Sequence, residues 1–132
     1  MFNQKVKYIL LLAARLVIGG IFVIQGWNKV SGMEGTVGFF SQMGLPAAVA
    51  YLVAYGELLG GLAVILGLWL EWVAIGLGVI MLGAIYYVWP MGLRGFGFPL
   101  SLFGGLLALL ATGPGNWALS FKKREAGQQI AQ

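Results

Sequence analysis

Four long apolar stretches follow one another along the chain, separated by short segments rich in Gly, Pro or charged residues. The stretches cover about residues 8–28, 48–68, 72–89 and 96–113. Each is close to the roughly 20 residues that an α-helix needs to cross the hydrocarbon core of a bilayer. The pattern predicts an all-α fold, a polytopic membrane protein whose four transmembrane helices form an antiparallel bundle.

The connection between the first two stretches, residues 29–47, is the longest of the three. Phe39, Phe40 and Met43 would lie on one face of a short helix at the membrane interface. The glycines at 32, 35, 38 and 44 are equally typical of a plain loop, so both interpretations stay open. Pro46 suits the first turn of the next helix.

The bundle is predicted to be a single domain of residues 1–120, followed by a basic cytoplasmic tail of residues 121–132. Gly and Pro in the segment "GPGN" (113–116) end the last helix. An even number of spans places both termini on one side. The positive-inside rule makes that side the cytoplasm, because the terminal segments hold Lys5, Lys7, Lys122, Lys123 and Arg124, against Lys29 and Arg94 opposite.

The composition agrees with a membrane protein and excludes several kinds of chemistry. Hydrophobic residues make up 60% of the chain and charged residues only 9%, too few to cover a water-facing surface. The chain has no Cys and no His, so it lacks the usual ligands of haem, iron–sulfur clusters and zinc, and no metal site is expected. The net charge of +4 lies mostly at the chain ends and forms no folded basic face for nucleic acid.

The first apolar stretch carries a stripe of polar, small and aromatic residues. Arg15, Gly19, Phe22, Gly26 and Lys29 follow one another at steps of four and three, which places them on one helix face. Gln25 flanks this stripe.

The other stretches repeat the pattern more weakly. In the second, Gly56 and Gly60 make a GxxxG step that allows two helices to approach closely. The faces that we expect to carry the small and polar residues are Ala50, Val53, Glu57, Gly60, Val64 and Gly67 in the second stretch, Gly76, Val79, Gly83 and Tyr86 in the third, and Ser101, Gly104, Ala108 and Thr112 in the fourth.

Arg15 and Glu57 are two charges of opposite sign inside apolar stretches. Counted from the same side, Arg15 lies about 10 Å and Glu57 about 15 Å deep, and each costs roughly 2.5 to 3.5 kcal/mol in mid-membrane. We therefore predict that they pair inside the bundle. The pair would fix helix register or line a polar pocket or proton path. Alternatively, Arg15 extends to the inner surface and Glu57 is protonated.

Asn28 and Lys29 stand at the outer boundary of the first stretch. They are either an interfacial anchor or, together with Gln25, the polar rim of a pocket that opens outward.

Four segments make the chain resemble the DoxX family of small four-helix bacterial membrane proteins. They are "ARLVIGGIFVIQGWNKVSG", "GFFSQMGLP", "GELLGGLAVILGL" and "GPGNWALS", which occur in this order over nearly the whole chain. Gln25 stands where many relatives have His, Ser120 where the closing motif often has Asp, and "FPLSLFGG" lacks an acidic residue that some relatives carry. The resemblance assigns the family's motif positions to Arg15, Gly19, Phe22, Gly26, Lys29, Glu57, Gly61 and Gly67.

The resemblance implies a small subunit of a quinone-linked oxidoreductase, since some family members serve thiosulfate:quinone or quinol oxidase systems. Such a subunit would lie in the lipid bilayer, dock other membrane or redox subunits and bind quinone in a pocket. It would not be catalytic alone. We expect this pocket to be bounded by Arg15, Phe22, Gln25, Glu57 and Tyr86, with Gly19, Gly26, Gly56, Gly60 and Gly67 packing the helices. The alternatives are a purely structural accessory subunit and a small-solute transporter.

Overall fold

The computed structural model describes residues 3–113, which contain helices and short connections but no β-strand. Four helices are long and apolar enough to cross a membrane. The chain is thus an all-α polytopic membrane protein, as its sequence predicts. In chain order, the elements are α1 (Gln4–Ser31), α2 (Met33–Gln42), α3 (Ala47–Leu66), α4 (Leu70–Val88), the short 3-10 helix η1 (Trp89–Met91) and α5 (Leu93–Thr112).

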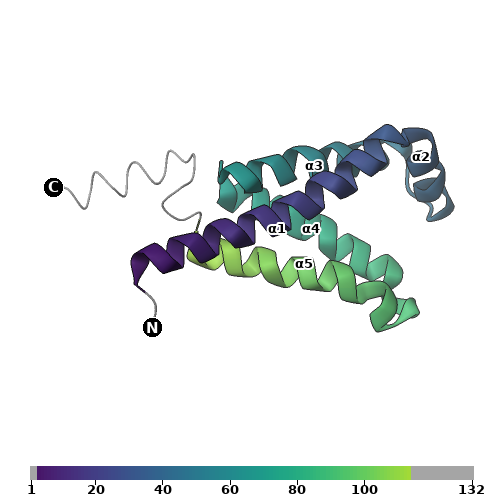
Figure 1. Ribbon diagram of the computed structural model, residues 1–132. Coiled ribbons are helices and arrows are strands. Elements are labelled where there is room, and N and C mark those ends of the chain that lie inside the picture. Colours follow the sequence, from purple (N-terminus) through teal and green to yellow (C-terminus); the bar gives the residue numbers. More distant parts are fainter. Residues whose placement is uncertain (1–2, 114–132) are drawn as a thin grey trace.

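The four long helices form two pairs, α1 with α3 and α4 with α5, and α3 also contacts α4. The pairs lie together near the start of α1 and diverge toward α2 (Figure 1). The end of the molecule that holds α2 and η1 is called the α2 end below. The start of α1 and the end of α5 lie together at the opposite end. This up-and-down order is the one that short connections impose on neighbouring helices.

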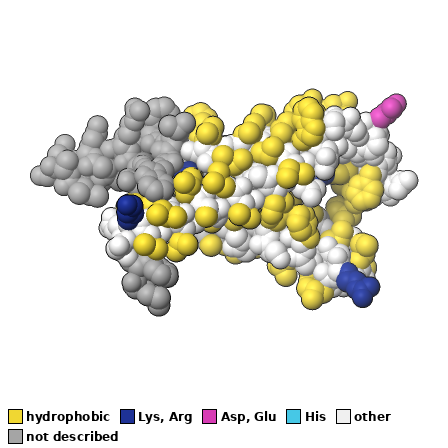
Figure 2. Space-filling model, viewed as in Figure 1, with side chains coloured by type: hydrophobic (Ala, Val, Ile, Leu, Met, Phe, Trp, Pro, Cys, Tyr) yellow, Lys and Arg dark blue, Asp and Glu magenta, His cyan; other side chains and the backbone are white. Residues whose placement is uncertain are grey.

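Large aliphatic side chains fill the space between the two pairs. Phe22 of α1 and Val64 of α3 meet residues of the second pair in one buried cluster, which also holds Leu70, Ala74, Leu77, Met81, Leu102, Leu106 and Leu109. On the face that Figure 2 shows, hydrophobic side chains are spread along the surface between the two ends, and the charged side chains lie toward the ends. This distribution suits a bundle whose sides face lipid.

The ends of the helices follow from local sequence. The side chain of Asn3 accepts a hydrogen bond of 2.9 Å from the Val6 amide, which caps α1. Gly67, with a φ of 71°, ends α3 in the left-handed conformation, and its amide reaches the carbonyls of Ala63 and Val64. The tight turn between the second and third stretches therefore begins at Gly67.

Residues 29–47 contain a helix, α2, rather than a plain loop. Phe40 is buried, whereas Phe39 is 59% exposed, so the predicted common face is wrong for Phe39. The two rings meet edge to face instead. Pro46 lies one position before the first residue of α3.

The small and polar faces predicted for the last two spans point outward. Tyr86 is 75% exposed, and all other members of both faces are exposed as well. Other residues, most of them large, form the buried sides: Leu70, Ala74, Leu77, Gly78 and Met81 in α4, and Pro99, Leu102, Leu106 and Leu109 in α5. A helix surface that faces lipid needs no polar side chains, so it can carry small residues as well as large ones. Small residues on α4 and α5 therefore do not mark an inner face.

Candidate functional site

Three glycines bring α1 and α3 into backbone contact. A Cβ atom on Gly26 would lie 2.3 Å from the Leu58 amide nitrogen, and one on Gly19 would lie 2.7 Å from the Gly61 carbonyl oxygen. A Cβ on Gly61 would in turn meet the Gly19 carbonyl at 2.7 Å. No larger residue fits at these positions without moving a backbone. The close approach fixes which residues of α1 and α3 stand opposite one another.

The predicted GxxxG residues of the second span serve a different contact. Gly60 faces Leu77 of α4, since a Cβ atom on Gly60 would lie 2.9 Å from Leu77 Cδ2. Gly56 faces Ile80 of α4, since a Cβ atom on Gly56 would lie 3.3 Å from Ile80 Cδ1. Gly61, not Gly60, meets α1. Gly67 acts through its backbone conformation at the end of α3.

The stripe predicted in the first span is the buried face of α1. Arg15, Gly19, Phe22 and Gly26 are the buried residues of this helix, and Lys29 continues the same face at its end. Phe22 is fully buried between the two polar ends of the stripe. The three-and-four spacing therefore located the inner face of α1 correctly.

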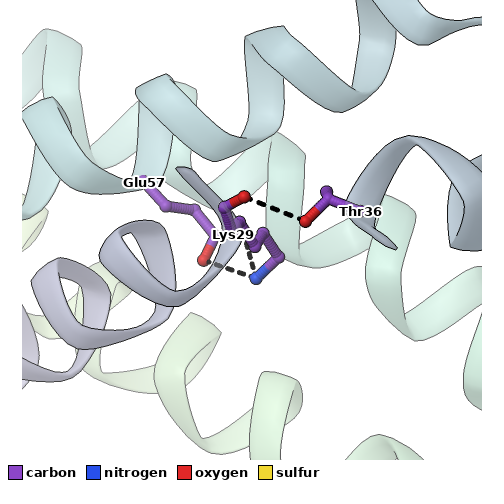
Figure 3. A network of polar contacts seen from close by, with 3 residues as sticks. All are labelled: Lys29, Thr36 and Glu57. Atoms are coloured by element: carbon purple, nitrogen blue, oxygen red, sulfur yellow. Dashed lines mark hydrogen bonds and ion pairs between the residues drawn. The ribbon is translucent and has the colours of Figure 1, made fainter. Parts of the chain in front are cut away.

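Glu57 forms an ion pair with Lys29 at the α2 end. Lys29 Nζ lies 3.1 Å from each carboxylate oxygen of Glu57, and it donates a hydrogen bond to Oε2. The Glu57 side chain is only 4% exposed, and that of Lys29 is 25% exposed. Figure 3 shows the two side chains reaching across from α1 and α3. A buried carboxylate requires such a partner, because an unpaired charge is costly in an apolar interior.

Thr36 ties α2 to this pair through the backbone. Its single hydroxyl hydrogen is shared between the Lys29 carbonyl at 3.0 Å and the Gly32 carbonyl at 3.1 Å. Figure 3 shows the contact with Lys29. The Lys29 carbonyl belongs to the last turn of α1, where carbonyls lack a partner within the helix. Thr36 was not predicted from the sequence. The one signal that could have found it is a hydroxyl residue shortly after the end of an apolar stretch.

The predicted pairing of Arg15 with Glu57 is wrong. Gly26 stands opposite Leu58, so Glu57 lies near the level of Gly26. Arg15 is eleven residues earlier in α1, a rise of about 16 Å, which is more than an arginine and a glutamate side chain can bridge. Phe22 also lies between them on the same face. Arg15 is buried in the half of α1 remote from α2.

The structure does not assemble the five predicted pocket residues into one site. Glu57 lies midway along α3, Arg15 is far from it, and Phe22 belongs to the core. Tyr86 is exposed, which corrects its assignment to the pocket. Gln25 is partly buried, one helical turn before Lys29.

The outer-boundary residues divide into two kinds. Asn28 is exposed, and its carbonyl accepts from the Gly32 amide at 3.2 Å. Lys29 is more than an interfacial anchor, because it pairs with Glu57 inside the bundle. Within residues 3–113, no group of three or more acidic, His or Cys side chains is arranged to hold a metal ion. The polar centre of the α2 end is therefore the Lys29–Glu57 pair.

Known proteins resemble the chain along most of its length. The chain is 42% identical over 77 residues to the Bacillus subtilis protein named "Putative oxidoreductase CatD", a match that spans 58% of each chain. It is 29% identical to the Escherichia coli inner membrane protein YqjF, over 88% of this chain and 93% of that protein. It is also 29% identical to the Escherichia coli inner membrane protein YphA, over 88% and 90%. No solved structure matches the chain.

A family model covers the part of the chain that holds the ion pair. Residues 10–90 match the DoxX model, and this range includes most of α1, all of α2 and α3, and α4. Lys29, Thr36 and Glu57 all fall inside it. Because the match extends over more than half of the residues, the chain belongs to the DoxX family.

Proposed function

We propose that the chain is a small subunit of a quinone-linked redox complex in a bacterial inner membrane, and that it binds quinone beside the Lys29–Glu57 pair. The name of CatD supports the redox part of this proposal, and the names of YqjF and YphA support the location. The four apolar helices fit a multi-pass subunit surrounded by lipid.

The ion pair is the observation on which the proposal rests. A quinone head group presents carbonyl oxygens, which accept hydrogen bonds, on a ring that partitions into the bilayer. Lys29 is a partly exposed donor at the end of an apolar bundle, and Glu57 holds it there. A few convergent polar groups in an apolar setting are typical of a small-molecule site.

The sequence contains no His and no Cys, and this limits the role that the chain would have in electron transfer. Without the usual ligands for haem or an iron–sulfur cluster, electrons would pass through the quinone and through the cofactor of a partner. The chain would hold the quinone and dock the partner rather than carry electrons by itself.

A purely structural accessory role is the second candidate. Ser101, Gly104 and Ala108 form an exposed line of small residues along α5. Small residues let two membrane helices approach closely, so this line suits contact with a helix of another subunit. A subunit of this kind would bind no quinone.

Quinone content separates the two candidates. We expect native protein, purified in mild detergent, to carry quinone that organic extraction and chromatography detect. The double variant Lys29→Met/Glu57→Met should carry about tenfold less, because it lacks the charged donor. The exposed Arg94 lies at the same end of the molecule, so Arg94→Gln is a matched control that should keep its quinone. Quinone-free native protein, or a double variant that retains quinone, would contradict the proposal.

We also propose that both termini lie in the cytoplasm. The start of α1 and the end of α5 lie together. The basic residues near the termini favour the cytoplasmic side of the membrane for this end of the molecule. Those after Gly113 lie outside the described residues. Green fluorescent protein fused after Gln132 should fluoresce, and alkaline phosphatase inserted after Gly35 in α2 should be active. A dark green fluorescent protein fusion together with inactive phosphatase at Gly35 would show the opposite orientation.

A further inference from the structure

We propose that the Lys29–Glu57 pair makes the quinone site selective for an uncharged acceptor. Lys29 contacts the ligand, and Glu57 is a positioning residue that also cancels the lysine charge. This inference rests on the proposed quinone binding, and it adds the chemical class of ligand that the site admits and the residue that decides it.

Lys29 has more hydrogen-bond donors than Glu57 can accept. An ammonium group has three N–H donors. Glu57 engages at most two of them, since its oxygens both lie 3.1 Å from Nζ. No other acceptor for Nζ occurs among residues 3–113. At least one N–H group of a partly exposed lysine thus remains for an external acceptor.

The two side chains of the pair differ in exposure. Glu57 is 4% exposed and Lys29 is 25% exposed, so a ligand that arrives at the α2 end meets the lysine first. Backbone contact between Gly26 and Leu58 holds the two helices that carry the pair. Thr36 fixes the backbone of Lys29 itself. The donor is therefore held in place before any ligand binds, which lowers the entropy cost of binding.

Lys29 and Glu57 together carry no net charge, so the site offers a donor without a free positive charge. A neutral carbonyl accepts a hydrogen bond from Lys29 without disturbing the pair. An anionic ligand would stand beside the Glu57 carboxylate and compete with it for the one lysine. Like charges placed side by side repel each other, which disfavours the anionic ligand.

Two matched naphthoquinones test this selectivity. Menadione is neutral, and its hydroxylated analogue phthiocol is an anion at mildly alkaline pH. Equilibrium dialysis of micelle-bound protein against empty micelles measures the retention of each. The proteins to compare are the native chain, Glu57→Gln and the double variant Lys29→Met/Glu57→Met. Glu57→Gln keeps Lys29 and the shape of its partner but removes the negative charge.

We expect the native protein to retain menadione about tenfold better than phthiocol. Glu57→Gln should prefer phthiocol, because its lysine charge is no longer cancelled. The double variant should retain both probes weakly, and circular dichroism should confirm that it is folded. A Glu57 that merely supports the fold would leave the ratio of the two probes unchanged.

The outcomes distinguish this inference from the proposed function. If native protein binds both probes equally, or if Glu57→Gln keeps the native preference, the selectivity is refuted while quinone binding stands. If a folded double variant binds as the native protein does, Lys29 does not contact the ligand. If native protein retains neither probe, the proposed quinone site itself is refuted.

Discussion

Replacing Gly26 with Ala is expected to destabilise the bundle by about 3 kcal/mol. The new methyl group would lie 2.3 Å from the Leu58 amide nitrogen and 2.6 Å from its Cα, and these atoms cannot move without shifting α3. The helices would separate, and the contacts of the neighbouring Gly19 and Gly61 would be lost with them. Unfolding in detergent by increasing amounts of sodium dodecyl sulfate, followed by circular dichroism, measures this loss.

Gly20→Ala is the matched control for this prediction. Gly20 lies in the same helix, and nothing stands within 4 Å of a Cβ built on it. Its replacement should leave stability unchanged or raise it by about 0.5 to 1 kcal/mol, since alanine is the better helix former. Equal stability of Gly26→Ala and Gly20→Ala would mean that α1 and α3 are not in backbone contact.

The four spans and the inner face of α1 could be predicted from the sequence. The length of each apolar stretch fixes a membrane helix, because the bilayer leaves backbone groups no other partner. The three-and-four spacing of Arg15, Gly19, Phe22 and Gly26 marks one helix face whatever the neighbouring helix does. Both signals are local, so a single chain is sufficient to find them.

The partner of Glu57 could not be predicted, because it depends on how α1 and α3 are aligned. Depth counted from the ends of the apolar stretches brings Arg15 and Glu57 to nearly the same level. The contact of Gly26 with Leu58 aligns the two helices differently and brings Lys29 to Glu57 instead. Glycine on both helices permits several close alignments, and the sequence alone does not choose among them.

The predicted inner faces of α4 and α5 are wrong for a related reason. In water, apolar residues go inside and polar residues outside, but both sides of a membrane helix are apolar. Tyr86 and Gly104 can therefore face lipid, while Leu77 and Leu106 fill the core. Residue size alone did not separate the two sides.

Loss of Lys29 is the second change expected to have a large effect. Lys29→Met leaves the Glu57 carboxylate buried without its counter-charge, which should cost about 3 to 5 kcal/mol. Glu57→Met should cost less, because Lys29 is partly exposed and its ammonium group can reach water. The double variant should recover most of the stability lost in Lys29→Met, since it buries no unpaired charge.

The pairing of Glu57 with Lys29 can be measured as the interaction energy of a double-mutant cycle. Stability in detergent is measured for the two single variants and the double variant, and again with Arg15→Met in place of Lys29→Met. We expect a coupling of about 2 kcal/mol or more between Lys29 and Glu57, and less than about 0.5 kcal/mol between Arg15 and Glu57. Additive effects for Lys29 and Glu57, or strong coupling of Glu57 to Arg15, would contradict the pairing.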